Sequence, residues 1–344
     1  IANGLTLPKS QNEIYLNGWS LEARLYAEDI NKNFLPQSGY LHHLKFPKIS
    51  DHPNCIIDTG NKKGDFISPY YDPMIAKIIS HGKNRKEAIN HLRNCLFDIE
   101  VAGITTNLNL LKKLLKNNHF REGDIYTKFV ENNIEQFMDK DVEPQLKALA
   151  SLIIFNNLTP SQQNYWYNWK PTTYPINITI GQKVTSFFVT KTSNKNFEVA
   201  FNNQDFYFSS VSFHDSTLKA KTKNKNFEVK FYVFKDKSTG NKNFTIFSDE
   251  NTFDAVLKNS LTQDSVEQSK FEDSIFAPMH GIIKINNLKI KNKVKKGDVL
   301  LKLEAMKMEY SLIAPRDGII KEIFCKNGEQ VTENSKLLNL EKVK

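Results

Sequence analysis

The stretch Leu303-Glu304-Ala305-Met306-Lys307-Met308-Glu309 lies at the junction of two copies of one sequence unit. Residues 277–283 read Ala-Pro-Met-His-Gly-Ile-Ile and residues 314–320 read Ala-Pro-Arg-Asp-Gly-Ile-Ile, an offset of 37 residues. Five further identical pairs keep this offset without a gap: Val294 and Val331, Leu300 and Leu337, Leu301 and Leu338, Leu303 and Leu340, and Glu304 and Glu341. Each copy is too short to bury its apolar face alone. The two copies are therefore predicted to fold against each other about a pseudo-twofold axis, as a flattened β-barrel.

Lys307 is predicted to lie near the tip of a β-hairpin, because apolar residues alternate on both sides of it. The face predicted to be buried comprises Val299, Leu301, Leu303, Ala305, Tyr310, Leu312 and Ala314, whereas Leu300, Lys302 and Glu304 face the other way. An amine can take an activated carboxyl group to form a stable amide, and a hairpin tip offers that amine to a ligase. The alternative is an ordinary turn lysine with Met306 and Met308 filling gaps. The flanking methionines, at the junction of a duplication, favour a modified lysine.

This stretch resembles the biotin-attachment hairpin of biotin-dependent carboxylases, through Glu304-Ala305-Met306-Lys307-Met308. The resemblance implies biotin bound covalently to Lys307, with Met306 and Met308 beside the cofactor, and a biotin protein ligase as a partner. Lipoyl domains share the duplicated barrel, but their modified lysine usually follows Asp rather than Ala-Met. The sequence therefore favours biotin over lipoate.

Residues 1–137 predict a mixed α/β fold. Apolar and polar residues alternate from Leu21 to Glu28, which is typical of a strand with one buried face. Asn84 and Glu87 form a capping-box-like start for a helix, and a second helix is expected around Leu111. The apolar positions of these two helices are Ala88, Leu92, Cys95, Leu96 and Ile99, and Leu108, Leu111 and Leu115.

A second resemblance covers most of this region. Residues 22–29, 34–36, 70–77 and 103–107 are similar to the C-terminal portion of the biotin carboxylase component of the same enzymes. The resemblance implies that Arg24 is a catalytic residue, which helps to hold bicarbonate and to stabilise charge on the ureido oxygen of biotin. A guanidinium suits this role because it is permanently charged, planar and bidentate. The alternative is a structural ion pair between Arg24 and Glu22 or Glu28.

Residues 1–137 contain neither a Gly-rich phosphate loop nor an acidic-Asn-Arg cluster that could hold nucleotide and magnesium. We therefore expect ATP and Mg²⁺ to bind a portion upstream of Ile1, and the isolated chain to be inactive as a carboxylase. The opening residues Ile1-Ala2-Asn3-Gly4 show neither an initiator Met nor a signal-peptide pattern, so we expect a fragment of a longer protein.

Residues 138–257 predict one helix followed by an antiparallel β-barrel. The helix begins at Pro144 and carries Leu146, Leu149, Ile153 and Ile154. Six strands are expected, at 176–180, 185–190, 197–201, 206–213, 227–234 and 244–247. By its position this region resembles the domain that joins acyl-CoA carboxylase α subunits to a carboxyltransferase β subunit. Trp166 and Trp169 are either interface residues or packing residues between helix and barrel.

Residues 258–274 are polar, lack a helical stripe and predict a flexible linker. A flexible chain of this length has a root-mean-square span of roughly 20–25 Å, enough to let a domain travel. Residues 275–344 then form the predicted biotinyl domain. The predicted fold class is multidomain α+β: part of a biotin carboxylase domain, a helix with a barrel, and an all-β duplicated-hairpin domain.

Composition excludes several other classes of function. The formal net charge is +9, but the lysines are spread along the chain, and the densest group, Lys289 to Lys296, is interpreted as a solvated hairpin face rather than a nucleic-acid site. No apolar run is long enough to cross a membrane. Cys55, Cys95 and Cys325 fall in separate regions without metal-ligand spacing, which predicts no metal site and a reducing, cytoplasmic location.

Together the two resemblances imply the C-terminal part of the α subunit of a biotin-dependent acyl-CoA carboxylase, an ATP-dependent ligase acting on bicarbonate and an acyl-CoA. The chain is most similar to 3-methylcrotonyl-CoA carboxylases, which implies a role in leucine catabolism. A propionyl-CoA carboxylase α subunit and a non-catalytic biotinylated carrier are the alternatives.

Overall fold

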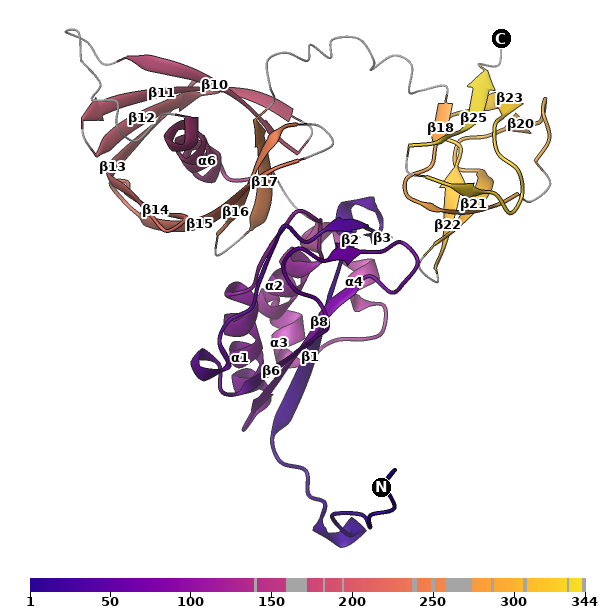
Figure 1. Cartoon of the computed structure of the whole chain (residues 1–344), viewed down its shortest axis with the longest axis horizontal. Coiled ribbons are helices and arrows are strands. Elements are labelled where there is room, and N and C mark those ends of the chain that lie inside the picture. The colour runs from indigo at the N-terminus through magenta and orange to yellow at the C-terminus, as the bar shows by residue number, and fades with distance from the viewer. Residues whose placement is uncertain are drawn as a thin grey trace.

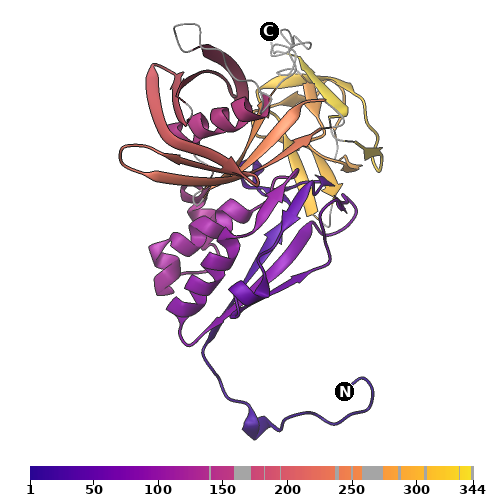
Figure 2. The ribbon, with the colours of Figure 1, turned by 60° about the vertical axis from the view of Figure 1, so that its left-hand side comes forward.

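A computed structural model of the protein describes residues 1–138, 141–158, 172–181, 183–193, 195–236, 240–248, 251–257, 274–285, 288–305, 308–332 and 334–341. Figure 1 shows three folded parts: an N-terminal part, a barrel and a C-terminal part. The first residues extend away from the folded parts in both views (Figures 1 and 2). Trp166, Trp169 and residues 258–273 lie outside the described ranges, so their predicted roles stay predictions.

The N-terminal part is an antiparallel sheet with helices against one face (Figure 1). The sheet order is β1 (Trp19–Tyr26), β8 (Met74–Gly82), β6 (Cys55–Thr59). Three short pairs surround it: β2 (Glu28–Asp29) with β3 (Leu35–Pro36), β4 (Gly39–Tyr40) with β7 (Phe66–Ile67), and β5 (His43–Lys45) with β9 (Glu100–Ala102). The helices are α1 (Arg85–Phe97), α2 (Leu108–Lys116), α3 (Asn118–Glu122), α4 (Phe129–Asn132) and α5 (Ile134–Phe137).

The sequence pattern explains how this part packs. Ala23 and Leu25 of β1 are buried, whereas Arg24 between them is exposed, as the alternation predicts. The Asn84 side chain caps α1 by accepting a hydrogen bond from Glu87 N at 3.0 Å. A Cβ atom at Gly82 would lie 2.4 Å from Ala88 N, so glycine is required where β8 meets the first turn of α1.

Two cysteines that the sequence placed in separate regions meet in this core. Cys55 on β6 and Cys95 on α1 are buried free thiols that interact with each other, and Cys55 Sγ donates a hydrogen bond to His91 O at 3.5 Å. Burial raises the pKa of the Cys95 thiol to about 12. Both thiols are therefore protonated at neutral pH and act as core residues.

The barrel closes around a helix. Eight antiparallel strands form it, and the last pairs with the first through Thr179 and Val256. The strands are β10 (Thr173–Ile180), β11 (Lys183–Ser193), β12 (Asn196–Phe201), β13 (Gln204–His214), β14 (Thr217–Lys221), β15 (Asn226–Lys235), β16 (Lys242–Phe247) and β17 (Thr252–Leu257). Helix α6 (Pro144–Leu158) lies inside (Figure 1), and every residue from Ala148 to Phe155 is buried. A helix that is apolar all round must be enclosed, and this arrangement confirms the predicted helix plus barrel.

The sequence missed two strands of this barrel. In β14 only Leu218 and Ala220 are buried, and the outward positions of this strand carry lysine. In β17 only Ala255 is fully buried. Short strands containing Lys, Ala and Asp have weak β propensity, so the closure of the barrel rather than local preference determines them.

The C-terminal part confirms the duplication. One sheet has the order β18 (Ser274–Phe276), β25 (Lys336–Glu341), β23 (Gly318–Ile323), β20 (Lys293–Val294). The other has the order β22 (Met308–Ile313), β21 (Val299–Ala305), β19 (Gly281–Lys284), β24 (Gln330–Val331). A shift of 37 residues converts each sheet into the other. Equivalent glycines in the two repeats also make equivalent close contacts. A Cβ atom at Gly281 would lie 2.8 Å from Glu304 O, and one at Gly318 would lie 3.0 Å from Glu341 O.

One part of the predicted alternation is wrong. Val299 is 56% exposed and Leu300 is buried, although the pattern predicted the reverse. The pairing register between β21 and β22 shifts between Val299 and Leu301, as in a β-bulge. The bulge turns both Leu300 and Leu301 into the core, because it inserts one residue into the strand.

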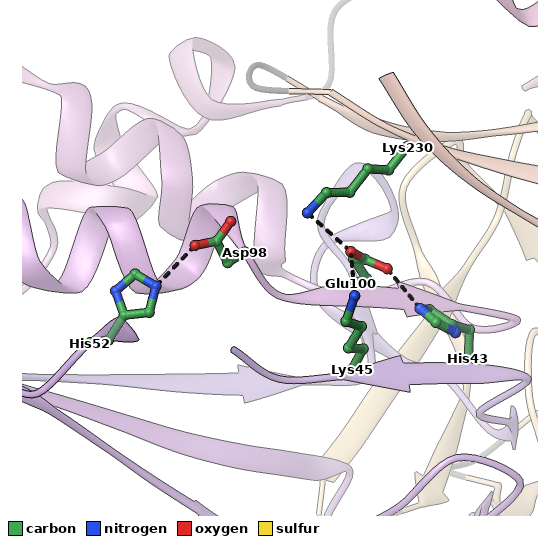
Figure 3. A network of polar contacts seen from close by, with 6 residues as sticks. All are labelled: His43, Lys45, His52, Asp98, Glu100 and Lys230. Atoms are coloured by element: carbon green, nitrogen blue, oxygen red, sulfur yellow. Dashed lines mark hydrogen bonds and ion pairs between the residues drawn. The ribbon is translucent and has the colours of Figure 1, made fainter. Parts of the chain in front are cut away.

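The N-terminal part contacts the barrel through a buried carboxylate, Glu100 (Figure 3). Glu100 lies 2.9 Å from His43 Nε2, 3.7 Å from Lys45 Nζ and 3.3 Å from Lys230 Nζ, and Lys230 belongs to the barrel. Burial alone would raise the pKa of Glu100, but the hydrogen bond with His43 and the charges of Lys230 and Lys45 lower it to about 2. Glu100 is therefore ionised at neutral pH and holds the two parts together.

Further contacts extend this interface. The His43 ring stacks on Tyr232 with centroids 4.5 Å apart, and the His42 ring stacks on Phe234 at 4.4 Å. The Asn109 side chain donates to Thr252 O at 2.9 Å and accepts from Thr252 N at 3.0 Å. An amide side chain that satisfies both backbone groups of one residue substitutes for a strand neighbour at the edge of β17.

Candidate functional site

Strands β21 and β22 form the predicted hairpin. Glu304 pairs with Glu309, and Ala305 pairs with Met308, so positions 306 and 307 connect the two strands. Met306 and Lys307 lie outside the described residues, as does the side chain of Met308. Their assignment as the biotin site therefore stays a prediction, while the strands on either side of them form the β-hairpin that the sequence predicted.

The hairpin is fixed on both faces. Leu303 and Ala305 are buried beneath it, and Gly281 allows close packing against Glu304 O. On the outer face, Lys284 Nζ lies 2.9 Å from carboxylate oxygens of both Glu304 and Glu309. These hydrogen bonds raise the pKa of Lys284, and the hydrogen bond from Lys284 is the main cause of the lowered pKa of Glu309. The network orients the two carboxylates that precede and follow the connection, although exposed ion pairs add little stability.

Arg24 lies on the exposed face of β1 and pairs in register with Lys77 of β8. Its Nε atom is 2.7 Å from Glu22 Oε1, and hydrogen bonding to Glu22 and then to Tyr26 raises the pKa of Arg24. The structural ion pair considered from sequence is therefore present with Glu22. The Arg24 side chain is 58% exposed, so its guanidinium can exchange this partner for an oxyanion without loss of packing.

The other candidate partner, Glu28, is held elsewhere. Asn107 Nδ2 donates to Glu28 Oε1 at 2.9 Å and to Arg24 O at 3.1 Å, and Asn107 Oδ1 accepts from Tyr26 N at 3.0 Å. Burial raises the pKa of Glu28. Asn107, which is buried, thus fixes the β1 backbone around Arg24. Sequence reasoning assigned no role to Asn107, although it lies in the segment 103–107 that carries the second resemblance.

Two other properties of the described residues bear on function. Within the described ranges, no three His, Cys, Asp or Glu side chains are grouped so that they could hold a metal ion. In the same part of the chain, no helix is long and apolar enough to span a membrane.

Two known protein families match separate parts of the chain. Residues 22–132 match the family described as biotin carboxylase C-terminal domain, and residues 274–340 match the family described as biotin-requiring enzyme. The chain thus contains one region that matches a biotin carboxylase C-terminal domain and a second, separate region that matches a biotin-requiring enzyme.

Individual proteins similar to this chain include α subunits of two acyl-CoA carboxylases. The methylcrotonoyl-CoA carboxylase α subunit of Arabidopsis thaliana is 40% identical over 44% of this chain and 20% of its own length. The mouse methylcrotonoyl-CoA carboxylase α subunit is 28% identical over 89% of this chain and 44% of its own length. The propionyl-CoA carboxylase α chain of Caenorhabditis elegans is 37% identical over 47% of this chain and 23% of its own length. The matched stretches thus span less than half the length of each of these relatives.

Among solved structures, the biotin carboxylase domain of the Hydrogenobacter thermophilus 2-oxoglutarate carboxylase is 33% identical. The similarity covers 41% of this chain and 30% of that domain, with a TM-score of 0.39.

Proposed function

We propose that this chain is the C-terminal part of the biotin-carrying α subunit of an acyl-CoA carboxylase of the 3-methylcrotonyl-CoA type. The observation that carries the proposal is the presence, in one chain, of a biotin carboxylase C-terminal domain and a separate biotinyl-type domain. Either domain alone would fit several enzymes. Their combination fits a subunit in which one end helps to carboxylate biotin and the other end carries it.

In this proposal Lys307 is the attachment point of biotin, with Met306 and Met308 beside the cofactor. Bound biotin supplies a ureido nitrogen that accepts and releases a carboxyl group. The chain contributes a hairpin whose strands, on either side of positions 306 and 307, are fixed by buried Leu303 and by the Lys284 network, and a biotin protein ligase would recognise this hairpin. Arg24 contributes a permanent positive charge that binds bicarbonate or an oxyanion on the N-terminal part.

The remaining components lie on other parts of the enzyme. We propose that ATP and Mg²⁺ bind an ATP-binding portion outside residues 1–137, and that a carboxyltransferase β subunit binds the acyl-CoA. The α subunit then takes part in leucine catabolism. We propose the cytoplasm as its location, because its three cysteines are buried free thiols. The three relatives named above are mitochondrial proteins, so subcellular fractionation is the test of this point.

Biotinylation tests the proposal directly. The chain is co-expressed with a biotin ligase and probed with streptavidin, and we expect a signal that Lys307→Arg abolishes. Lys321→Arg, at an exposed lysine of β23, serves as the matched control and should keep the signal. A signal that survives Lys307→Arg would refute the assignment.

The two alternatives require the complete enzyme. We expect the complete α subunit with its β subunit to carboxylate 3-methylcrotonyl-CoA with a higher kcat/KM than propionyl-CoA. The reverse preference would make it a propionyl-CoA carboxylase. Biotinylation of a complete subunit that carboxylates neither substrate would indicate a non-catalytic carrier.

A further inference from the structure

Where the β2–β3 loop meets β3, two consecutive apolar side chains pack in different parts of the molecule. Asn33 and Phe34 both have left-handed backbone conformations, with φ of 55° and 59°. Phe34 packs with Ile30 and Phe129 of the N-terminal part. Leu35, the next residue, is 2% exposed and packs in the apolar cluster of the C-terminal part. Left-handed backbone at a bulky side chain is unfavourable and persists where its surroundings fix it, as they do here.

A second contact joins the same two parts. Gln330 Nε2 on β24 donates a hydrogen bond to the Tyr70 hydroxyl at 2.7 Å. Gln330 pairs with Ile282 of β19, and Ile282 pairs with Glu304 of β21. Gln330, Ile282 and Glu304 therefore lie side by side on three neighbouring strands. Glu304 is the residue before Ala305, which ends β21 at the hairpin connection. Figures 1 and 2 both place the C-terminal part beside the β2–β3 loop.

We propose that Leu35 and Tyr70 form a docking site on the N-terminal part for the C-terminal domain of the same chain, engaged when biotin is carboxylated. This inference rests on the proposed function and adds the surface by which the carrier is held. Leu35 pairs with Asp29, which follows Arg24 by five residues, so the Cα atoms of Asp29 and Arg24 are at most roughly 18 Å apart. The docking site and the proposed anion-binding arginine therefore lie in one region of the N-terminal part.

The duplication makes this docking specific for one repeat. The residue equivalent to Gln330 in the other repeat is Lys293, which lies in an exposed, lysine-rich segment. Only the Gln330 repeat places the hairpin of β21 and β22 next to the contact, because β24 belongs to their sheet. Among the described residues, the contact that we use consists of one buried leucine and one exposed hydrogen bond, and a small contact suits a domain that must leave again.

Chemical cross-linking of the whole chain tests the proposal. Exposed cysteines are introduced near the contact but not in it, as Tyr71→Cys with Thr332→Cys, and a short bismaleimide is added. The native cysteines are buried. The matched control is Tyr71→Cys with Lys295→Cys, because Lys295 is the repeat equivalent of Thr332 and is also exposed. Docking raises the effective concentration of one pair, so we expect the Thr332 variant to cross-link about tenfold faster than the control.

Variants of the contact complete the test. In the Thr332 background, Tyr70→Phe should slow cross-linking, and Leu35→Gln should reduce it to the control rate. Equal rates for the two cysteine pairs would overturn the proposal, as would an unchanged rate in a folded Leu35→Gln variant. If Leu35→Gln does not fold, the comparison of the two pairs decides alone. Streptavidin binding is measured separately on the same chain. If biotin is present on Lys307 but the two cysteine pairs cross-link at equal rates, only the docking is overturned. If the Thr332 pair cross-links faster but the chain carries no biotin, only the proposed function is overturned.

Discussion

Glu100 Oε1 and Lys230 Nζ lie 3.3 Å apart, although 130 positions separate the two residues in the sequence. Glu100 is the first residue of β9 and pairs with Lys45 of β5 in the N-terminal part, whereas Lys230 belongs to strand β15 of the barrel. The carboxylate is almost fully buried while the ammonium is half exposed. The contact therefore fixes the barrel on the N-terminal part through a charge that cannot return to water without separating the two.

We expect Glu100→Gln to lower the free energy of unfolding by about 1–3 kcal/mol, because it removes a buried charge partner while Lys230 regains only part of its hydration. Urea unfolding followed by circular dichroism measures the change. Glu228→Gln removes the exposed ion pair with Lys219 and should change stability by less than about 0.5 kcal/mol. Equal effects of the two substitutions would contradict a structural role for Glu100.

The stability contributed by Glu100 should depend on pH in a defined direction. Its pKa is lowered from the ordinary 4.5 to about 2, so the folded state favours the ionised form. The contribution is complete above the ordinary pKa and is lost as pH falls from there toward the folded-state pKa, a change of the order of 3 kcal/mol. The stability difference between the wild type and Glu100→Gln, measured from about pH 6 to about pH 3, should therefore shrink. A constant difference would rule out this linkage.

Asn107→Ala should destabilise the N-terminal part by about 2–4 kcal/mol, because it leaves Tyr26 N and Arg24 O without their partner in a buried place. Thermal or urea unfolding measures the effect. Asn132→Ala is the control, because Asn132 is exposed. Its side chain donates a hydrogen bond to the Tyr126 hydroxyl at 3.2 Å rather than to a buried backbone group. Similar losses in both variants would argue against a special role for Asn107.

Gly281→Ala should destabilise the C-terminal part by about 1–3 kcal/mol, because the new Cβ would lie 2.8 Å from Glu304 O and force β19 and β21 apart. Gly60→Ala is the matched control: nothing lies within 4 Å of its added Cβ, and the residue is not in the left-handed region. Streptavidin blotting of both variants shows whether the displaced hairpin is still a ligase substrate. Unchanged stability of Gly281→Ala would show that the strands can move without loss.

Arg24→Ala, introduced into the complete α subunit with its β subunit, should lower carboxylation by about 10²–10³-fold, because it removes a fixed positive charge from the proposed anion site. Arg24→Lys should retain part of the activity, since it keeps the charge but not the bidentate fork. Biotin on Lys307 should be unaffected in both. Wild-type activity of Arg24→Ala would leave the ion pair with Glu22 as the role of this arginine.

The sequence predicted the features that depend on local pattern. The offset of 37 residues predicted two equivalent halves, and the shift that converts one sheet into the other confirms it. The Asn84 cap, the alternation in β1 and the apolar helix after Pro144 were predicted for the same reason: each depends on neighbours in sequence.

The features that the sequence missed depend on distant partners. Strands β14 and β17 form because a barrel must close, and the bulge at Val299 turns Leu300 inward because two sheets share one core. Asn107 gains its importance from backbone groups more than 80 positions away. No local pattern encodes the meeting of Cys55 with Cys95 or of Glu100 with Lys230.

The helix inside the barrel also constrains how the chain can be made. Helix α6 precedes all eight strands in sequence, so a ribosome releases an apolar helix before any of the wall that will enclose it. Until β17 pairs with β10, the apolar side chains of this helix are exposed to water, and exposed apolar surface promotes aggregation. Once enclosed, the helix packs its side chains in one apolar cluster with the inward side chains of the strands, so the barrel wall and the helix must form their shared core together.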